Sequence, residues 1–600
     1  MGNECFKVNL LDMNQKRKSL KMFGRLISFV KPYKPLFGLA AFCVVLLSFL
    51  SPFRPYLIGT MVDRYIVNSQ NAELLLTWSI GIAVLLFSEG ILQFASSYFS
   101  NLLAQSVIRD IRKNLFKHIV SFRMKYFDKT PVGALVTRVV SDLEAITQVF
   151  SSGIMEISGD LISLSMVLSL MFITNWQLSL MTLIPIPLLI VATRIFAKAM
   201  RSSFQLERLQ VTKLNTFVQE HLTGMSIVQI FNKNKEEYAK FVEINKGHRR
   251  AHINAVWANS IFFPVVEILS SLSIAFLLVW GALRVDGKST LEIQAMYGQI
   301  IAFTLWIYQL YRPIRQLADK FNVLQRGVVR AERIFEILDH DAQSQFGGAL
   351  ENVDFNADIS FKGVSFAYKE GQDVLRNIDL NIEKGTTVAI VGSTGAGKST
   401  IINILGRFYE HERGEIRIGE VKIEDIQLSY LRKNIAVVLQ DIFLFSDTIH
   451  NNITLGDDQI SRAQVIEASR AVGAHDFISR LPGNYDYSIG ERGTVLSVGQ
   501  RQLLSFIRAF VYNPQVLILD EATSSVDNES EVLIQRATEQ ITKGRTSIVI
   551  AHRMSTIQNA DLIVVMDKGE IIESGTHQQL IKREGKYNTL YEKQIFQPKG

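Results

Sequence analysis

The stretch TTVAIVGSTGAGKSTIINIL, residues 386–405, decides the fold of the C-terminal half of the chain. Its apolar run 387–391 is typical of a buried strand, and a glycine-rich loop and a helical pattern follow it. A strand, a glycine-rich loop and a helix in this order form the context that a phosphate-binding P-loop requires. We therefore expect an α/β nucleotide-binding domain around this stretch.

The residues of this loop suit the chemistry of phosphate binding. Glycine has no Cβ, so Gly392, Gly395 and Gly397 let backbone amides approach phosphate oxygens. Lys398 is placed to reach the β- and γ-phosphates, and the Ser399 hydroxyl to bind Mg²⁺. The residues expected to hold the nucleotide here are Gly392, Ser393, Thr394, Gly395, Ala396, Gly397, Lys398, Ser399 and Thr400.

Two further strand-like runs end in residues suited to hydrolysis. QVLILDEATSSVD, residues 515–527, ends its apolar part in two adjacent carboxylates. At the carboxyl edge of a parallel sheet we expect Asp520 to hold the Mg²⁺ shell and Glu521 to accept a proton from the attacking water. A run that ends at His552 would place its imidazole near the γ-phosphate, although a lone histidine at a strand end is more often structural.

The stretch ERGTVLSVGQRQLLSFIRA, residues 491–509, predicts a loop to Ser497 and then an amphipathic helix. Serine is a preferred N-cap residue, so an ordinary cap explains the pattern when it is taken alone. The alternative is an anion site, because the first amides of a helix lack acceptors within the helix. These residues alone leave both interpretations open.

The apolar residues collect in the first half of the chain. With 600 residues, at least two domains are expected, and 48% apolar with 20% charged residues indicates a chain that is part membrane and part soluble. Several apolar stretches are each about the ~20 residues that span a bilayer as a helix. The six predicted spans are 36–59, 74–103, 154–174, 177–199, 257–283 and 293–312.

The distribution of basic residues sets the expected topology. Arginine and lysine crowd the N-terminal segment and the stretches 104–150 and 200–250, whereas the alternate connections are short and nearly neutral. By the positive-inside rule, both ends of the six-helix block lie in the cytoplasm. The net charge of +7 is then explained by topology, and no nucleic-acid partner is expected. Two cysteines, Cys5 and Cys43, exclude a disulfide framework and a zinc site.

The pattern along the chain suggests four parts. We expect a cytoplasmic N-terminal segment at 1–35, a six-helix membrane domain at 36–340, a polar linker at 341–356 and the nucleotide-binding domain at 357–600. The long cytoplasmic connections read as helical extensions of the spans. Their expected tips lie at 127–146 and 222–241, where proline or glycine breaks occur.

Together these motifs resemble a half-size ABC exporter of the type IV, multidrug and lipid-flippase kind, over about residues 20–595. GSTGAGKST is similar to the Walker A motif and VLILDE to the Walker B motif with its catalytic glutamate. FAYKEG places Tyr368 where the family stacks adenine, and VVLQDIFLFSDTIHNNI gives Gln440 the role of metal and water contact in the Q-loop. SSVD matches the D-loop with Asp527, His552 matches the switch histidine, and IGERG resembles the X-loop.

The resemblance also interprets the helix that begins after Ser497. LSVGQ is similar to the family signature, whose Ser497, Gly499 and Gln500 would contact an ATP held by the opposite nucleotide-binding domain. A chain with one such domain must then pair with a second half-transporter and sandwich two ATP and Mg²⁺ sites. The tips at 127–146 and 222–241 would be coupling helices that dock on the Q-loop region. Nucleotide-driven closure would turn the membrane halves outward.

One residue departs from that signature. Val498 stands where the family usually has glycine, so the backbone there must tolerate an ordinary helical or extended conformation. Heterodimeric exporters often carry an altered signature that faces a degenerate site on the partner, whereas a homodimer would carry Val498 in both sites. The sequence leaves homodimer and heterodimer open.

The resemblance implies export of a hydrophobic or amphipathic drug or lipid across a bacterial-type cytoplasmic membrane. A soluble ABC ATPase would lack the six spans, an importer usually separates its domains on different chains, and use as a channel is rare. The cargo itself is not specified. Among the acidic residues of the spans, Glu89 and Glu267 are hypothesised to line the cavity and favour cations. Glu156 and Asp160 equally suit interhelical bonding.

Overall fold

The computed structural model describes residue 22 and residues 24–68, 72–283, 290–340, 348–520, 528–551 and 554–595. The chain divides into two compact units. The first consists of Met1–Val120 and Thr130–Asp341, and the second of Ser121–Lys129 and Ala342–Gly600.

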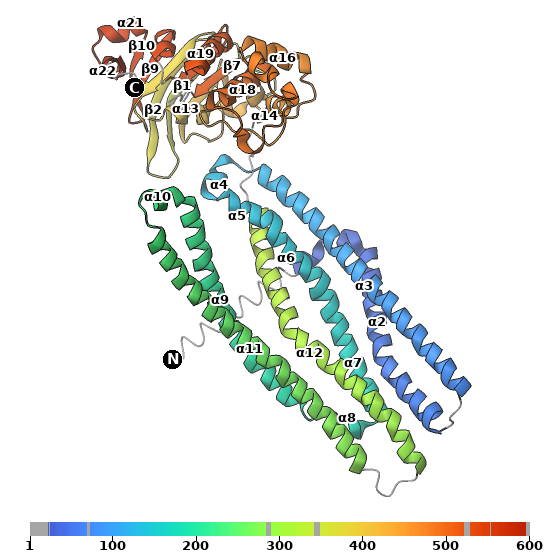
Figure 1. The fold of residues 1–600 in the computed structure, drawn as a ribbon. Helices are drawn as coiled ribbons and strands as arrows, with labels where there is room; N and C mark the ends of the chain where they lie inside the picture. Colours follow the sequence, from blue (N-terminus) through green and yellow to red (C-terminus); the bar gives the residue numbers. More distant parts are fainter. Residues whose placement is uncertain are drawn as a thin grey trace. The chain divides into compact units, whose positions relative to one another are not determined.

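The described residues of the first unit form helices joined by short turns, with no strand, and the long helices run up and down (Figure 1). Its elements are η1 (Lys31–Tyr33), α2 (Lys34–Met61), η2 (Val62–Asn68), α3 (Ala72–Val120), α5 (Val132–Thr137), η3 (Arg138–Asp142), α6 (Leu143–Gln148), η4 (Val149–Met155), α7 (Glu156–Thr174), α8 (Trp176–Leu183), α9 (Ile186–Thr223), α10 (Met225–Ile230), α11 (Asn234–Leu283) and α12 (Thr290–Leu338).

Five helical stretches among the described residues are long and apolar enough to cross a membrane. They are Lys31–Val67, Ala72–Val120, Val132–Thr174, Trp176–Thr223 and Asn234–Leu283. The sixth predicted span, 293–312, lies inside the continuous helix α12. Glutamines and tyrosines interrupt its apolar sequence, which lowers its hydropathy, while Phe303 and Trp306 on the same segment are fully buried against neighbouring helices. One face of this stretch therefore packs against protein, while Ile301 and Tyr308 are exposed.

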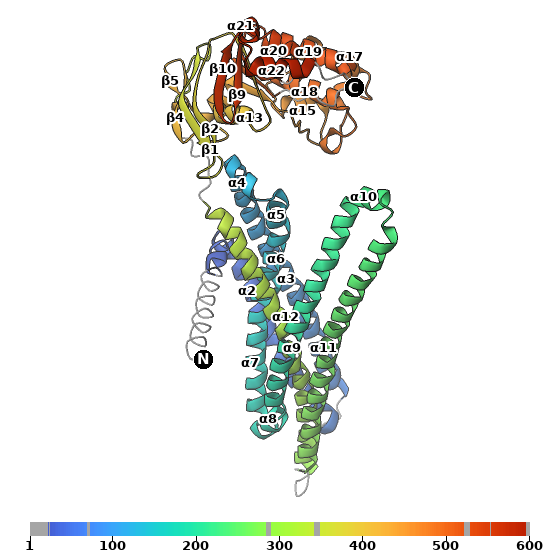
Figure 2. The same ribbon diagram turned by 90° about the vertical axis from the view of Figure 1, so that its left-hand side faces the viewer.

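Helices α9 and α11 form a long antiparallel pair joined through the short helix α10, and both views show them side by side (Figures 1 and 2). Two cross-helix contacts fasten the part of the pair nearer α10. His221 of α9 lies 2.7 Å from Glu237 of α11, and Glu207 of α9 lies 2.7 Å from His252 of α11. Helix α10 falls within the predicted tip at 222–241.

The segment from α5 to α7 is broken by π-helical turns at η3 and η4. The second turn lies where this segment closely approaches α12. A Cβ atom on Gly327 would stand 1.9 Å from a methyl carbon of Val149, so only glycine permits this approach. Such bulges accommodate a tight helix contact at the cost of regular hydrogen bonding.

The second unit contains two sheets. Its strands are β1 (Ile359–Ala367), β2 (Asp373–Ile382), β3 (Thr387–Gly392), β4 (Arg413–Ile418), β5 (Val421–Lys422), β6 (Ile435–Val438), β7 (Val516–Asp520), β8 (Thr546–Ile550), β9 (Leu562–Asp567) and β10 (Glu570–Gly575). One sheet has the order β2-β1-β4-β5 and is antiparallel. The other has the order β10-β9-β3-β8-β7-β6 and is parallel except at β10.

Helices complete this unit (Figure 1). They are α4 (Met124–Lys129), α13 (Lys398–Leu405), η5 (Ile423–Asp425), α14 (Leu428–Asn434), α15 (Ile449–Thr454), α16 (Arg462–Ala471), α17 (His475–Ser479), η6 (Asn484–Asp486), η7 (Glu491–Gly493), α18 (Val498–Val511), α19 (Asn528–Thr542), α20 (Met554–Gln558), α21 (His577–Lys582) and α22 (Lys586–Ile595).

The parallel sheet separates two hydrophobic cores. Along β3, Val388 and Ile390 join the core that contains helix α13, whereas Ala389 and Val391 join the core that contains α18. This alternation is the period of two that a strand imposes on its side chains. Helices α13 and α18 therefore lie over opposite faces of the sheet.

Candidate functional site

The loop between β3 and α13 has the backbone that phosphate binding requires. Gly392, Gly395 and Gly397 have φ angles of 154°, 83° and 99°. A Cβ atom on Gly392 would lie 2.2 Å from the carbonyl oxygen of Met566, so another residue would clash with β9. The glycines thus allow a turn in which the loop amides are available to a phosphate bound at the N-terminus of α13.

Lys398 is the first residue of α13 and folds back over this loop. Its Nζ donates to the carbonyl oxygens of Gly392 at 2.8 Å and Ser393 at 3.0 Å. Burial lowers the pKa of Lys398, and the nearby Asp520 carboxylate opposes that shift. The buried ammonium is therefore held mainly by partial charges, which a phosphate anion can replace with a stronger interaction.

Two of the predicted magnesium ligands, Ser399 and Asp520, come together at the adjacent strand end. The Ser399 hydroxyl lies 3.5 Å from a carboxylate oxygen of Asp520, the last residue of β7. β6 runs parallel to β7 with Val438 opposite Leu519, so Gln440, two residues beyond β6, follows the same sheet edge. Hydroxyl, carboxylate and amide oxygens are ligands that Mg²⁺ prefers. The residues present fit Mg²⁺ bound beside the P-loop.

Tyr368, which follows β1, lies beside the P-loop helix. Its hydroxyl donates to the Thr400 hydroxyl at 3.3 Å and accepts from the Asn403 amide at 3.1 Å. Its ring meets Phe366 edge to face at 4.8 Å. The ring is therefore positioned by contacts at both ends. Asn403 was not predicted from the sequence, because no motif around it distinguishes it from any other polar residue of a helix.

The signature stretch begins helix α18 with a capping box. The amide of Gln500 donates to Ser497 Oγ at 3.2 Å, and the amide of Ser497 donates to Gln500 Oε1 at 3.0 Å. The ordinary-cap interpretation is thus part of the answer. The amides of Val498 and Gly499 lie in the first turn, where helix geometry provides no intrahelical acceptor. An anion site can therefore coexist with the cap.

Val498 has an ordinary place in this helix. It is the first helical residue, and 44% of its surface is exposed. Gly499 beside it is buried. The valine side chain thus projects from the end of α18 without disturbing the helix.

The P-loop and the signature belong to different cores. Helix α13 packs through Ile401 and Leu405 on one side of the sheet, and α18 packs through Leu503 and Phe506 on the other. The sheet lies between the two helices, as both faces of β3 show.

Three predicted site residues, Glu521, Asp527 and His552, lie outside the residues that the structure describes. Their neighbours fix where the chain enters each gap. β7 ends at Asp520, and β8 ends at Ile550 beside it in the same parallel ladder. β3 pairs with the other side of β8. The roles of these three residues therefore remain predictions from the sequence.

Three acidic residues of the predicted spans, Glu89, Glu156 and Asp160, lie beside cations. Glu89 is buried and lies 3.2 Å from Arg54 of α2. Lys320 of α12 contacts Asp160 at 2.6 Å and Glu156 at 3.2 Å. The interhelical alternative thus describes Glu156 and Asp160. The Arg54 contact gives Glu89 a partner for its charge, and the hypothesis that Glu89 and Glu267 line the cavity stays a prediction.

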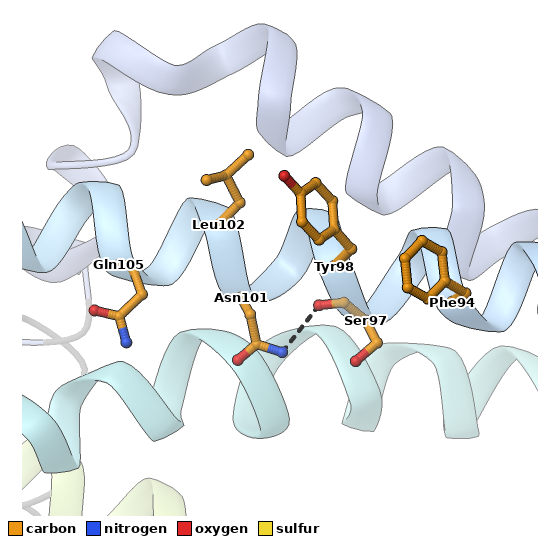
Figure 3. A pocket seen from close by; sticks show the side chains of 6 residues that line it. All are labelled: Phe94, Ser97, Tyr98, Asn101, Leu102 and Gln105. Carbon is orange, nitrogen blue, oxygen red and sulfur yellow. Dashed lines mark hydrogen bonds between the residues drawn. The ribbon is translucent and has the colours of Figure 1, made fainter.

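A shallow pocket without charged residues lies on the surface of α3 (Figure 3). Its lining residues succeed one another along the helix, and Asn101 donates to the carbonyl oxygen of Ser97 at 2.9 Å. The lining combines aromatic rings, an aliphatic side chain, a hydroxyl and amides, with no formal charge. It consists of Phe94, Ser97, Tyr98, Asn101, Leu102 and Gln105.

Two family models match the chain. The model described as the ABC transporter transmembrane region matches residues 37–314, and the model described as ABC transporter matches residues 375–524. The first covers the helical unit from α2 into α12, and the second covers the P-loop, the signature and the strand that ends at Asp520.

Similar proteins cover nearly the whole chain. An uncharacterised ABC transporter ATP-binding protein of Bacillus subtilis, YknV, is 36% identical over 95% of this chain and 94% of its own length. An ATP-dependent lipid A-core flippase of Syntrophus aciditrophicus is 35% identical over 100% and 98%. A putative ABC transporter ATP-binding protein of Streptococcus pneumoniae, exp8, is 35% identical over 96% and 98%.

Proposed function

The chain belongs to the ABC transporter family as a half-size exporter, and we propose from that premise that it moves a hydrophobic or amphipathic molecule out of the inner leaflet by alternating access. ATP-driven export is the activity of this architecture, in which a multi-pass membrane region and an ABC ATPase domain share one chain. The finer proposal concerns the residues, the partner and the cargo.

The P-loop geometry carries the proposal for the energy source. The positive φ angles at the loop glycines present the amides, and Lys398 adds a buried positive charge next to them. Ser399 and Asp520 would hold Mg²⁺, which supplies charge neutralisation for the phosphates. We assign Glu521 to polarising the attacking water, with Gln440 and His552 oriented toward the same region.

A second chain is proposed to complete each ATP site. Helices α13 and α18 lie over opposite faces of one sheet, so the signature amides are supported by a core that the P-loop helix does not share. Head-to-tail pairing would bring Ser497, Gly499 and Gln500 of one chain to the phosphates held by another, and Asp527 to the interface between them. Two copies, or this chain with a related half-transporter, satisfy that geometry.

The cargo surface is proposed to be the uncharged face of α3. Phe94 and Tyr98 are 72% and 53% exposed, and amides flank them along the helix. Aromatic rings suit an acyl chain or a drug ring, and amides suit hydrogen-bonding head groups. The buried Glu89 carboxylate already lies beside Arg54, so a cationic ligand would have to compete with that pair.

Lipid and drug cargo both fit this surface. A lipid is favoured by one observation, since a similar protein over the whole chain is a lipid A-core flippase. The test is ATPase activity of the purified chain in nanodiscs, titrated with a panel of lipids and of cationic and neutral amphiphiles. Stimulation by amphiphiles with no preference for cations supports the proposal, and a response confined to cations contradicts the uncharged surface.

A further inference from the structure

The last turn of α9 holds a histidine whose two ring nitrogens both face hydrogen-bond acceptors. His221 Nδ1 lies 2.8 Å from the carbonyl oxygen of Phe217, one turn earlier in the same helix. Its Nε2 lies 2.7 Å from a carboxylate oxygen of Glu237 on α11. A carbonyl oxygen has no proton to donate, so the first contact requires a proton on Nδ1.

The second contact also requires a proton from the histidine. The other carboxylate oxygen of Glu237 accepts from Lys240 Nζ at 2.8 Å, and this cation favours the ionised carboxylate. An ionised carboxylate only accepts hydrogen bonds, so Nε2 of His221 must donate as well. With a proton on each nitrogen, the ring is an imidazolium.

The aromatic neighbour of His221 suits the same charge. The Phe217 ring lies against the imidazole, with the two centroids 3.8 Å apart and the planes at 19°. A cation over the face of an aromatic ring is attracted by the negative potential of that face. The carbonyl oxygen, the carboxylate and the ring face thus all favour the protonated form of His221.

A second histidine between the same helices differs in one respect. His252 Nδ1 lies 2.7 Å from a carboxylate oxygen of Glu207. Its Nε2 has no hydrogen-bond partner among the residues that the structure describes, and 56% of its side chain is exposed. A neutral imidazole with its one proton on Nδ1 can make this contact. The His252 contact can therefore survive loss of the second proton, whereas the two contacts of His221 cannot both survive it.

The charged groups around His221 come from α9 and α11. Helix α10, MSIVQI, has no charged side chain. From α11 the ring meets the pair of Glu237 and Lys240, and a second ion pair, Lys233 with Glu236, lies within one turn of it. On α9, Glu220 beside His221 is exposed. Loss of the imidazolium would therefore leave Glu237 with Lys240 as its cation.

We propose that His221 is a proton switch of the α9–α11 pair, which holds the last turn of α9 against α11 as an imidazolium and releases it when the second proton passes to water. Histidine is the side chain that ordinarily changes charge between about pH 5 and 8. A neutral ring has one N–H for two acceptors, so one of the two contacts becomes repulsive and the ring leaves its place. The stretch 200–250 is predicted to be cytoplasmic, so the switch responds to cytoplasmic pH.

The experiment measures amide hydrogen exchange of residues 217–230 in the full chain in nanodiscs, at about pH 5.5 and about pH 8.5, with rates corrected for the intrinsic effect of pH. The variants are His221→Gln, which cannot titrate, His221→Arg, which is charged at both pH values, and His252→Gln as the matched control. NMR spectra of protein with isotope-labelled histidine report the charge state of His221, and His221→Gln assigns its signal.

We expect exchange in the starting protein and in His252→Gln to be about fivefold faster at the higher pH, because one charged contact is lost. His221→Gln should exchange fast at both pH values and His221→Arg slowly at both. The His221 signal should change from an imidazolium to a neutral ring between the two pH values.

Three results would overturn the proposal. The first is a pH-dependent rate that survives in His221→Gln or disappears in His252→Gln. The second is exchange in His221→Arg as fast as in His221→Gln, since a permanent cation would then not hold the helices together. The third is a charge state of His221 that is the same at both pH values.

Discussion

The two units hold their buried charges in opposite ways. In the ATPase unit, the Lys398 ammonium donates to two backbone carbonyl oxygens. In the membrane unit, Arg54 faces Glu89 at 3.2 Å and Lys320 faces Asp160 at 2.6 Å. A phosphate can displace carbonyl partial charges with a gain in electrostatic energy, whereas a cargo would have to compete with a full opposite charge. The contrast supports our proposal of ionic recognition at the P-loop and uncharged recognition at the membrane helices.

The largest expected effects lie in the ATPase unit. Glu521→Gln should keep ATP binding and lower steady-state hydrolysis by about 10²–10⁴, the usual contribution of a positioned base. Lys398→Ala should instead weaken nucleotide binding, because it removes the buried cation of the loop. Binding and turnover measured on both purified variants separate the two roles. Near-normal turnover in Glu521→Gln would remove that residue from catalysis.

A smaller loss is expected when a membrane ion pair is broken. Arg54→Leu leaves the buried Glu89 without its cation, so the melting temperature of the protein in detergent should fall. The cost should stay below the ~3–5 kcal/mol of a fully buried pair, since Arg54 is partly exposed. The double variant with Glu89→Leu removes both charges and should recover most of the stability. A double variant no more stable than Arg54→Leu would mean that the pair is not the source of the effect.

Substitution in the α3 pocket tests the proposed uncharged recognition of cargo. Phe94→Ala removes a ring whose burial against the cargo is worth about 1.5–3 kcal/mol. The concentration of amphiphile that stimulates the ATPase should therefore rise roughly tenfold or more. Phe87→Ala is the matched control, because Phe87 has the same 72% exposure on the same helix outside the pocket. Amphiphile-stimulated ATPase should shift only in the first variant. Equal shifts in both would show a general effect of the lipid-facing surface.

The smallest effect is expected at the signature. Val498→Gly removes an exposed side chain from the first turn of α18 and should cost at most about 0.5–1 kcal/mol of helix stability. In a homodimer the change touches both catalytic sites and should alter ATPase rate or ATP affinity. In a heterodimer it touches the degenerate site, and hydrolysis should hardly move. ATPase activity of the chain purified alone decides between the two. Robust turnover that depends on Glu521, with no second polypeptide present, would exclude an obligate heterodimer.

The sequence predicted the parts of the fold that local chemistry determines. The P-loop glycines, the strand that ends at Asp520 and the Ser497 start of α18 each carry their structure in a few adjacent residues. The family and its ATP-driven export followed from those motifs. The span in helix α12 is less evident from the sequence, because its polar residues are also typical of a soluble helix. The burial of Trp306 depends on neighbouring helices and is seen only in the structure.

The contacts between distant residues could not be predicted in the same way. Nothing near Glu89 indicates that Arg54, on another helix, lies beside it. The Tyr409 contact with Asp128 joins residues of two domains as the sequence divides them, and only tertiary packing brings them together. Periodicity and motif spacing report which face a residue occupies, whereas the identity of its partner depends on helix packing.

The central claim is that the phosphates at one chain's P-loop meet the signature of another chain. It is tested with two differently tagged, cysteine-substituted chains in the Glu521→Gln background, one with Ser393→Cys and the other with Val498→Cys, both at exposed positions. Oxidation with ATP and Mg²⁺ present should give a product that carries both tags, and without ATP the yield should fall sharply. An ATP-dependent cross-link within single chains that carry both cysteines, with no product between the tagged chains, would contradict the account.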